Sequence, residues 1–201
     1  MKRWAIGLAT MSLLSASRTE AKLNFSEGTA IRSLSQTANL DFGLRALRLD
    51  INEAVKARDA EAVASFLANR NTDVNAKDKD GCTPLMNAVM AQDQSIVLML
   101  AADRRVNVNI QGCGHATAAM LAVNGGPIGI LHALLQRPEI RLDIKDDQGH
   151  TALSWAAIAD NAAAIQALRN SGNRTLTDSD RQSALGLANR FGHRNAASAL
   201  T

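Results

Sequence analysis

The chain has 201 residues, of which 46% are hydrophobic, so it is long enough for one domain or a short repeat array with an ample buried core. Only 3% of the residues are aromatic and none is tyrosine, which argues against a stacking platform for single-stranded nucleic acid. The formal net charge is +3, and it falls to +1 without Lys2 and Arg3, which lie in a segment predicted to be removed. A basic surface built for nucleic acid is therefore not indicated.

The N-terminal segment 1–17, MKRWAIGLATMSLLSAS, has the layout of a secretory signal peptide. A positively charged start precedes an apolar run from Trp4 to Leu14. The small residues up to Ser17 match the pattern of a cleavage site before Arg18. The run is too short for a stable membrane span, and no cysteine follows it that could carry a lipid. We therefore expect residues 1–17 to be a signal peptide, and the mature chain to be periplasmic or secreted without membrane insertion. The alternative is a buried or interfacial N-terminal helix in a cytoplasmic protein.

The stretch after the signal peptide is rich in Ser, Thr, Glu, Lys and Gly and has few large apolar residues. We predict that residues 18–44 form a linker or a partly ordered N-terminal arm lying on the first repeat, and both alternatives stay open. Asp41 can cap a helix that runs toward Ala57.

Four copies of one short motif follow: DKDGCTPLMNAV (78–89), HATAAMLAV (115–123), GHTALSWAA (149–157) and RQSALGLAN (181–189). Thr83, Thr117 and Thr151 recur at one constant spacing, and Ser183 follows after a slightly shorter one. A turn with glycine followed by T-P-L-x-x-A resembles the signature of the ankyrin repeat. The chain thus resembles a bacterial ankyrin-repeat protein of the exported type, with an N-terminal signal peptide and the repeats from about residue 45 to 201.

This resemblance implies an all-α repeat fold, namely an ankyrin solenoid of about five helix-turn-helix units with β-hairpin-like turns between them. The ankyrin-repeat domain would cover residues 45–201. The expected helix pairs lie near residues 45–70, 84–103, 118–136, 152–170 and 184–201.

Apolar residues recur in the same phase and predict the faces on which the repeats stack. Positions three residues apart share one face of a helix, so two columns describe the stripe of each second helix. Each unit is too small to bury its own stripe and must pack on its neighbours. The first-helix column is Ile51, Leu85, Ala119, Leu153 and Leu185, and the second-helix columns are Val63, Val97, Leu131, Ile165 and Ala197, and Phe66, Leu100, Leu134, Leu168 and Leu200.

The turn residues agree with this repeat but depart from it at two places. The three motif threonines can cap the first helices, and Gly81 and Gly149 occupy turn positions that favour positive φ. His115 stands where glycine is expected, with Gly114 one residue early, so we expect that turn to be distorted. In the last repeat Arg181 replaces the glycine and the connection is two residues shorter, as suits a terminal cap.

No catalytic constellation is recognisable in the sequence, so we expect neither an enzyme nor a cofactor. Cys113-Gly114-His115 lacks the second pair of ligands that a structural zinc needs. His193 matches an inter-helix turn, where the family often places a histidine for a local hydrogen bond. We expect Trp155 to pack between neighbouring repeats, and the turn aspartates to cap local backbone.

The two cysteines, Cys82 and Cys113, lie in turns of adjacent repeats but not at equivalent positions. An exported chain meets an oxidising environment, so an even cysteine count is compatible with one disulfide. Two interpretations stay open at this point: a bond between Cys82 and Cys113, or two free and partly exposed thiols.

The resemblance implies a non-enzymatic protein–protein interaction module, a scaffold that binds another protein through its turn tips and the inner side of its first helices. We expect a monomer that binds neither nucleic acid nor membrane. Alternatives are a redox or oxidative-stress accessory that uses Cys82 and Cys113, and a secreted effector that binds a host protein. The residues predicted to form the binding face are Lys56, Lys79, Asp80, Met90, His115, Asn124, Asp147, Gln148, His150, Ile158 and Arg190.

Overall fold

The structure is a computed structural model that describes residues 50–201. These residues form ten α-helices and one short 3-10 helix, and they contain no β-strand. The predicted signal peptide (1–17), the predicted arm or linker (18–44) and Asp41 lie outside the described residues. The all-α repeat architecture expected from the sequence is confirmed for the described part of the chain.

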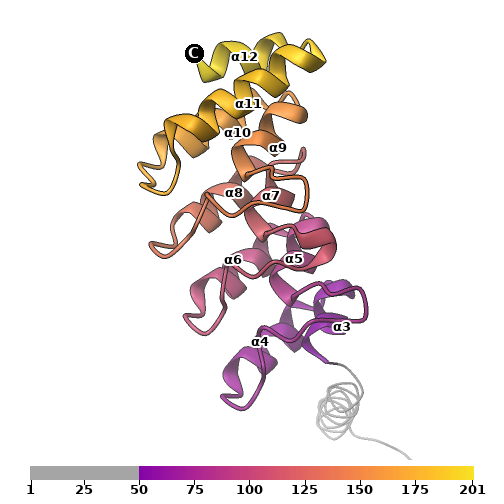
Figure 1. The fold of residues 1–201 in the computed structure, drawn as a ribbon. Coiled ribbons are helices and arrows are strands. Elements are labelled where there is room, and N and C mark those ends of the chain that lie inside the picture. The colour runs from indigo at the N-terminus through magenta and orange to yellow at the C-terminus, as the bar shows by residue number, and fades with distance from the viewer. Residues whose placement is uncertain (1–49) are drawn as a thin grey trace, which may run out of the picture. The chain divides into compact units, whose positions relative to one another are not determined.

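The helices stack as five consecutive pairs (Figure 1). The first helices α3, α5, α7 and α9 follow one another along one side of the stack, and the second helices α4, α6, α8 and α10 along the other. The pairs are α3 (Ile51–Lys56) with α4 (Ala60–Ala68), α5 (Pro84–Met90) with α6 (Gln94–Ala102), α7 (Ala118–Ala122) with α8 (Ile128–Leu135), α9 (Ala152–Ile158) with α10 (Ala162–Asn170), and α11 (Asp178–Phe191) with α12 (Arg194–Leu200), while the 3-10 helix η2 (Cys113–His115) precedes α7.

The motif threonines begin the first helices, as the sequence predicts. Thr83, Thr117 and Thr151 have extended backbone and are the N-caps of α5, α7 and α9. Each hydroxyl accepts the backbone N–H three residues on, at 3.3 to 3.4 Å, and so satisfies one donor that the first turn leaves free.

The buried core is continuous across the repeats, because each apolar column packs on the next. Leu100, Leu134 and Leu168 are fully buried on successive second helices, and Leu85 and Leu153 are 2% exposed on first helices. Three predicted column members, Phe66, Leu185 and Ala197, are only partly buried. They belong to the first and last described pairs, which have a neighbouring pair on one side only among residues 50–201.

The last pair differs from the sequence prediction. Helix α11 begins at Asp178 rather than near residue 184, so Arg181, expected in the turn, lies inside the helix together with Ser183. Thr177 is the N-cap, and its hydroxyl accepts the N–H of Asp180 at 3.2 Å while the Asp180 carboxylate accepts the N–H of Thr177 at 3.0 Å. This reciprocal pair starts the helix earlier than the repeat phase alone predicts.

Two second helices, α10 and α12, are linked to the preceding repeat by polar side chains at their N-termini. Asn161 donates from its amide to the carbonyl of Val123 at 2.9 Å. His193, at the equivalent position, places Nδ1 3.0 Å from the carbonyl oxygen of Ala157. The local hydrogen bond predicted for His193 is therefore wrong, because the imidazole reaches the neighbouring repeat instead.

A pair of asparagines forms a second, polar connection between repeats. Asn109 donates to the carbonyl of Glu139 and accepts the N–H of Arg141, both at 2.8 Å. Asn75, at the equivalent position one repeat earlier, makes the same two bonds to Arg105 and Asn107, also at 2.8 Å. The loops are thereby held in register by bonds that recur from one repeat to the next.

The turns adopt the backbone that their residues predict. Gly81 and Gly149 have φ of +78° and +79°, a region that side-chain-bearing residues rarely adopt. In the distorted turn Gly114 and His115 have φ of +63° and +57° inside η2, so the expected distortion is confirmed.

Truncating interior column residues should destabilise the array strongly. Leu100→Ala and Leu134→Ala should each lower the free energy of unfolding by about 2–5 kcal/mol, because each leaves a cavity between packed helices. Leu200→Ala, in the last helix, should cost less because that helix has a neighbour on one side only. Urea melts of the three variants test this, and equal losses at all three sites would contradict a stack whose stability is a sum over interfaces.

Candidate functional site

Three turns connect the first four repeats, and they are candidate binding elements because six of the eleven residues predicted for the binding face lie in them. In each turn the N–H of the first residue donates to the carbonyl of the fifth. The bonds are Asp78 to Cys82 at 2.9 Å, Gly112 to Ala116 at 3.0 Å, and Asp146 to His150 at 3.0 Å. The side chains that hold the three turns, however, differ.

The first turn is organised around the buried carboxylate of Asp78. Oδ1 accepts the backbone N–H groups of Asp80 and Cys82 at 3.0 and 2.9 Å. Oδ2 accepts the Asn87 amide at 2.9 Å and the Lys56 ammonium at 2.8 Å. Burial raises the pKa of Asp78, but the Lys56 and Asn87 bonds and the two backbone donors outweigh it, and the pKa falls well below its usual range. The carboxylate is thus anionic and has all its acceptor positions occupied.

From the sequence alone, Lys56 is predicted to lie on the binding face. In the structure its ammonium is held in an ion pair with Asp78. Its ammonium is held 2.8 Å from Asp78 and 3.7 Å from Glu53. The pKa of Lys56 is raised, chiefly by the hydrogen bond to Asp78. Sequence reasoning missed this contact because Lys56 and Asp78 lie far apart in the sequence and meet only when neighbouring repeats stack.

The second turn has no aspartate at its first position and is joined to the first turn by a disulfide. Cys82 and Cys113 are bonded, with their Cα atoms 4.8 Å apart, within the span a disulfide allows. Gly112 is required here by close approach, since a Cβ would lie 2.5 Å from the Met86 sulfur and 2.6 Å from the carbonyl oxygen of Gly81. The disulfide therefore joins two turns that approach too closely for an aspartate at position 112, where the other two turns have Asp78 and Asp146.

The third turn repeats the arrangement of the first around Asp146. Oδ1 accepts the backbone N–H groups of Gln148 and His150 at 2.9 and 2.8 Å, and Oδ2 accepts the Trp155 indole N–H at 2.7 Å. Burial raises the pKa of Asp146, but these three donors outweigh it and lower the pKa. The His150 ring lies 3.9 Å from Oδ2, which is too long for a hydrogen bond.

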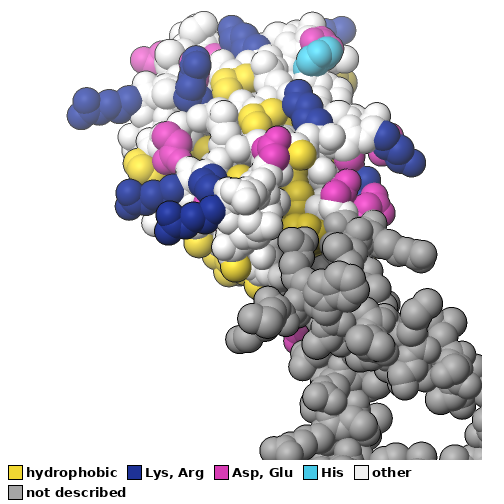
Figure 2. All heavy atoms as spheres, turned by 90° about the horizontal axis from the view of Figure 1, so that it is seen from below, with side chains coloured by type: hydrophobic (Ala, Val, Ile, Leu, Met, Phe, Trp, Pro, Cys, Tyr) yellow, Lys and Arg dark blue, Asp and Glu magenta, His cyan; other side chains and the backbone are white. Residues whose placement is uncertain are grey.

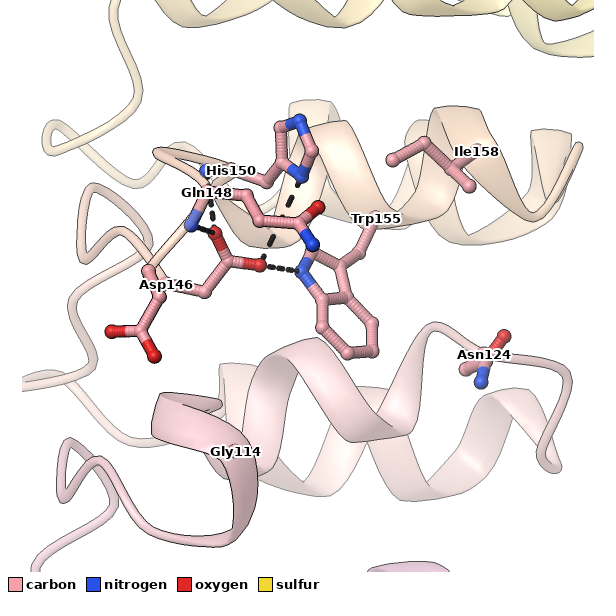
Figure 3. Close-up of a pocket in the computed structure, with 8 residues that line it drawn as sticks. Gly114, Asn124, Asp146, Gln148, His150, Trp155 and Ile158 are labelled. Atoms are coloured by element: carbon pink, nitrogen blue, oxygen red, sulfur yellow. Dashed lines mark hydrogen bonds and ion pairs between the residues drawn. The ribbon is translucent and has the colours of Figure 1, made fainter.

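A pocket of about 440 Å³ opens in front of this turn. It lies between the third turn and α9 on one side and α7 with its preceding turn on the other (Figure 3). The indole of Trp155 points from α9 toward α7, with Asp146 at one edge and Asn124 at the far end of α7. We call this the Trp155 pocket, and it is lined by Gly114, Asn124, Asp146, Asp147, Gln148, His150, Trp155 and Ile158.

The structure brings five of the predicted face residues together in the Trp155 pocket: Asn124, Asp147, Gln148, His150 and Ile158. His115 lies at its rim, where Nδ1 is 2.5 Å from Asp147 Oδ2. Met90 lines a second hollow of about 250 Å³ that also includes Asn124. Lys79, Asp80 and Arg190 are exposed but line neither hollow.

Sequence reasoning missed the two central residues of the pocket, Asp146 and Trp155. It assigned Trp155 to packing and Asp146 to local capping, and each does more than that. A signal was present, since Asp146 and Trp155 have the same separation in sequence as Asp78 and Asn87. Both pairs join a turn carboxylate to an N–H donor on the following helix.

Figure 2 shows the face of the described residues at the α3–α4 end of the stack. Seen from the side of α3 and α4, Lys and Arg side chains are mixed with Asp and Glu, and apolar side chains show between them. Within residues 50–201, no group of three or more His, Cys, Asp or Glu side chains could hold a metal ion. None of the helices in that range is long and apolar enough to cross a membrane.

Most of the chain matches a known protein family. The family model described as Ankyrin repeats (3 copies) matches residues 51–146 and 120–201. No curated protein is similar enough to count as a match.

Replacing the lysine that closes the first turn should destabilise the array. Lys56→Met removes the partner of a buried carboxylate, so its melting temperature should fall, whereas Lys79→Met, at an exposed neighbouring position, should melt like the original chain.

The difference in melting temperature between the two variants should disappear in acid. Because the folded pKa of Asp78 lies below its ordinary 3.8, the stability from its charge is present above that pH and is lost as pH falls below it. Thermal melts across this range test the assignment, and identical melting of the two variants at neutral pH would contradict it.

Proposed function

The chain belongs to the ankyrin-repeat family, whose members generally mediate protein–protein interaction, and from this premise we propose that it is an exported, non-enzymatic module that binds another protein. The proposal places the protein in the periplasm, as a monomer whose first-helix side is the binding face. Ankyrin repeats are typically interaction modules without enzymatic activity, which supports the non-enzymatic part.

The observation that carries the proposal is a pair of neighbouring hollows beside the first helices. The Trp155 pocket and the hollow beside Met90 share Asn124, so they adjoin across the third repeat. Met90 is 48% exposed and Ile158 is partly exposed, and both stand at the last position of a first helix. Apolar groups surrounded by polar and charged ones are typical of protein interfaces.

The second-helix side is the competing surface. Leu98 on α6 is 49% exposed, and Ile128 on α8 is 39% exposed. Ile128 also lines a hollow of about 580 Å³ with Leu135 and Ala167, but no carboxylate, Trp or Phe side chain of residues 50–201 lines it. The first-helix side is favoured because an aromatic side chain, a buried carboxylate and several polar groups converge there in one pocket, as is usual for binding sites.

The redox alternative receives less support. A reactive cysteine needs an accessible thiolate. Cys82 is only 4% exposed and is bonded to Cys113, and the chain has no third cysteine that could resolve or exchange the bond. The arrangement suits a covalent link between two turns.

Export rests on the N-terminal segment 1–17. N-terminal sequencing of the natural protein should begin near Arg18, as the charged start, apolar run and small residues predict. Recovery of the intact chain from the cytoplasm, with Met1 in place, would contradict export and leave the binding face untouched.

The binding face is tested by matched substitutions on the two sides of the stack. Met90→Asp should weaken capture of a periplasmic partner about tenfold or more, because it places a charge in the apolar part of the face. Leu98→Asp, which is equally exposed on the second-helix side, should leave capture unchanged. Pull-down with purified chain followed by titration of the recovered partner gives both affinities, with thermal melts to show that the variants stay folded. Loss of binding with Leu98→Asp but not with Met90→Asp would place the interface on the other side.

A further inference from the structure

Asp78 and Asp146 make the same hydrogen bonds to their own turn and to the following helix, and the His150 ring nitrogen, 3.9 Å from Asp146 Oδ2, is too distant to add another. In each, Oδ1 accepts two backbone N–H groups of its own turn, and Oδ2 accepts one side-chain N–H from the following helix, Asn87 or Trp155. Both side chains are well buried, with 6% and 7% exposed. The two sites occupy equivalent positions two repeats apart.

Among residues 50–201, one partner is missing at the second site. At Asp78 the remaining acceptor position of Oδ2 receives the ammonium of Lys56, the last residue of α3. The residue two repeats after Lys56 is Asn124, whose side chain is too short for this role and which is not among the hydrogen-bond partners of Asp146. A carboxylate offers about four acceptor positions, so Asp146 with three bonds has one left. The Trp155 pocket is the space in front of it.

The walls of the pocket suit the rest of a lysine side chain. The Trp155 ring and Ile158 provide apolar surface along which four methylene groups can lie while the ammonium reaches the carboxylate. An aromatic face also attracts a cation directly. Asp147 at the rim adds a second carboxylate, one oxygen of which also contacts the His115 ring.

We propose that the Trp155 pocket binds the side chain of a lysine supplied by a partner protein, with its ammonium on Oδ2 of Asp146 in the place that Lys56 occupies on Asp78. The inference rests on the proposed function, because it assigns the anchor by which the face would recognise its partner. The partner is thus expected to carry an exposed lysine in the segment that crosses the third and fourth repeats.

Two other occupants fit the pocket less well. A purely apolar side chain would contact Trp155 and Ile158 but would cover the last acceptor of a buried carboxylate without bonding to it, which is unfavourable. An acidic side chain would approach Asp146 and Asp147 and be repelled by both. The side chain that this chain itself uses at the equivalent site is a lysine.

Small probes test the pocket without the partner. Nα-acetyl-lysine amide and Nα-acetyl-norleucine amide, which differ chiefly in the presence of the ammonium, are titrated into the full chain. The indole N–H signal of Trp155 is followed by NMR, and Trp155→Phe identifies that signal against the other tryptophan, Trp4. We expect a saturable shift with the lysine probe, with a dissociation constant roughly in the millimolar range, and at least about tenfold weaker binding of the norleucine probe.

A substitution at Asn124 tests whether the lysine probe binds in the Trp155 pocket. Asn124→Lys should weaken binding of the lysine probe at least about tenfold, because the chain then carries its own ammonium at this position. Equal shifts with both probes would show an apolar pocket and overturn the proposal, as would no shift with the lysine probe or undiminished binding to Asn124→Lys. These outcomes are independent of the capture experiment. A face that binds a partner but leaves the lysine probe unbound retains the proposed function and loses only this anchor.

Discussion

The stacking of each helix pair on its neighbours is the interaction on which the rest of the structure depends. No single pair can bury Leu100, Leu134 or Leu168, because each lies between its own first helix and the helices of adjacent repeats. Polar contacts between the loops add to this apolar packing, since Asn75 and Asn109 bond to the next repeat in the same way. Together they fix the spacing at which the turns project, and hence the distance between the residues of the Trp155 pocket.

Within this constraint, the three turns share one backbone hydrogen bond but are held by different side-chain contacts. The first uses a carboxylate closed by Lys56, the second a disulfide to the preceding turn, and the third a carboxylate closed only in part by Trp155. The first and second turns are linked to each other covalently, and the carboxylate of the first is occupied from within the chain. The third turn keeps an open acceptor beside the Trp155 ring, which is why we place the proposed lysine anchor there.

Much of this fold could be predicted from the sequence, because its determinants are local and recur. The threonine caps, the glycines with positive φ and the apolar columns each depend on a few neighbouring residues that return at the repeat spacing. The start of α11 was missed because a capping pair, Thr177 with Asp180, overrides the repeat phase. The pocket was found only in part, since the contact of Lys56 with Asp78 and the bond of Trp155 to Asp146 depend on how neighbouring turns and helices meet, which a list of exposed positions does not contain.

The central claim is that Asp146 lacks the lysine that Asp78 has, and a double-mutant cycle on melting temperature tests it most directly. Asn124→Lys should melt higher than Asn124→Met, a comparison with the residue that this chain carries at the same position in its second repeat. A cation near the end of α7 also benefits from the helix dipole, so the comparison is repeated with Asp146→Asn, where most of the advantage should vanish. An advantage of lysine that survives the loss of Asp146, or no advantage at all, would contradict the account.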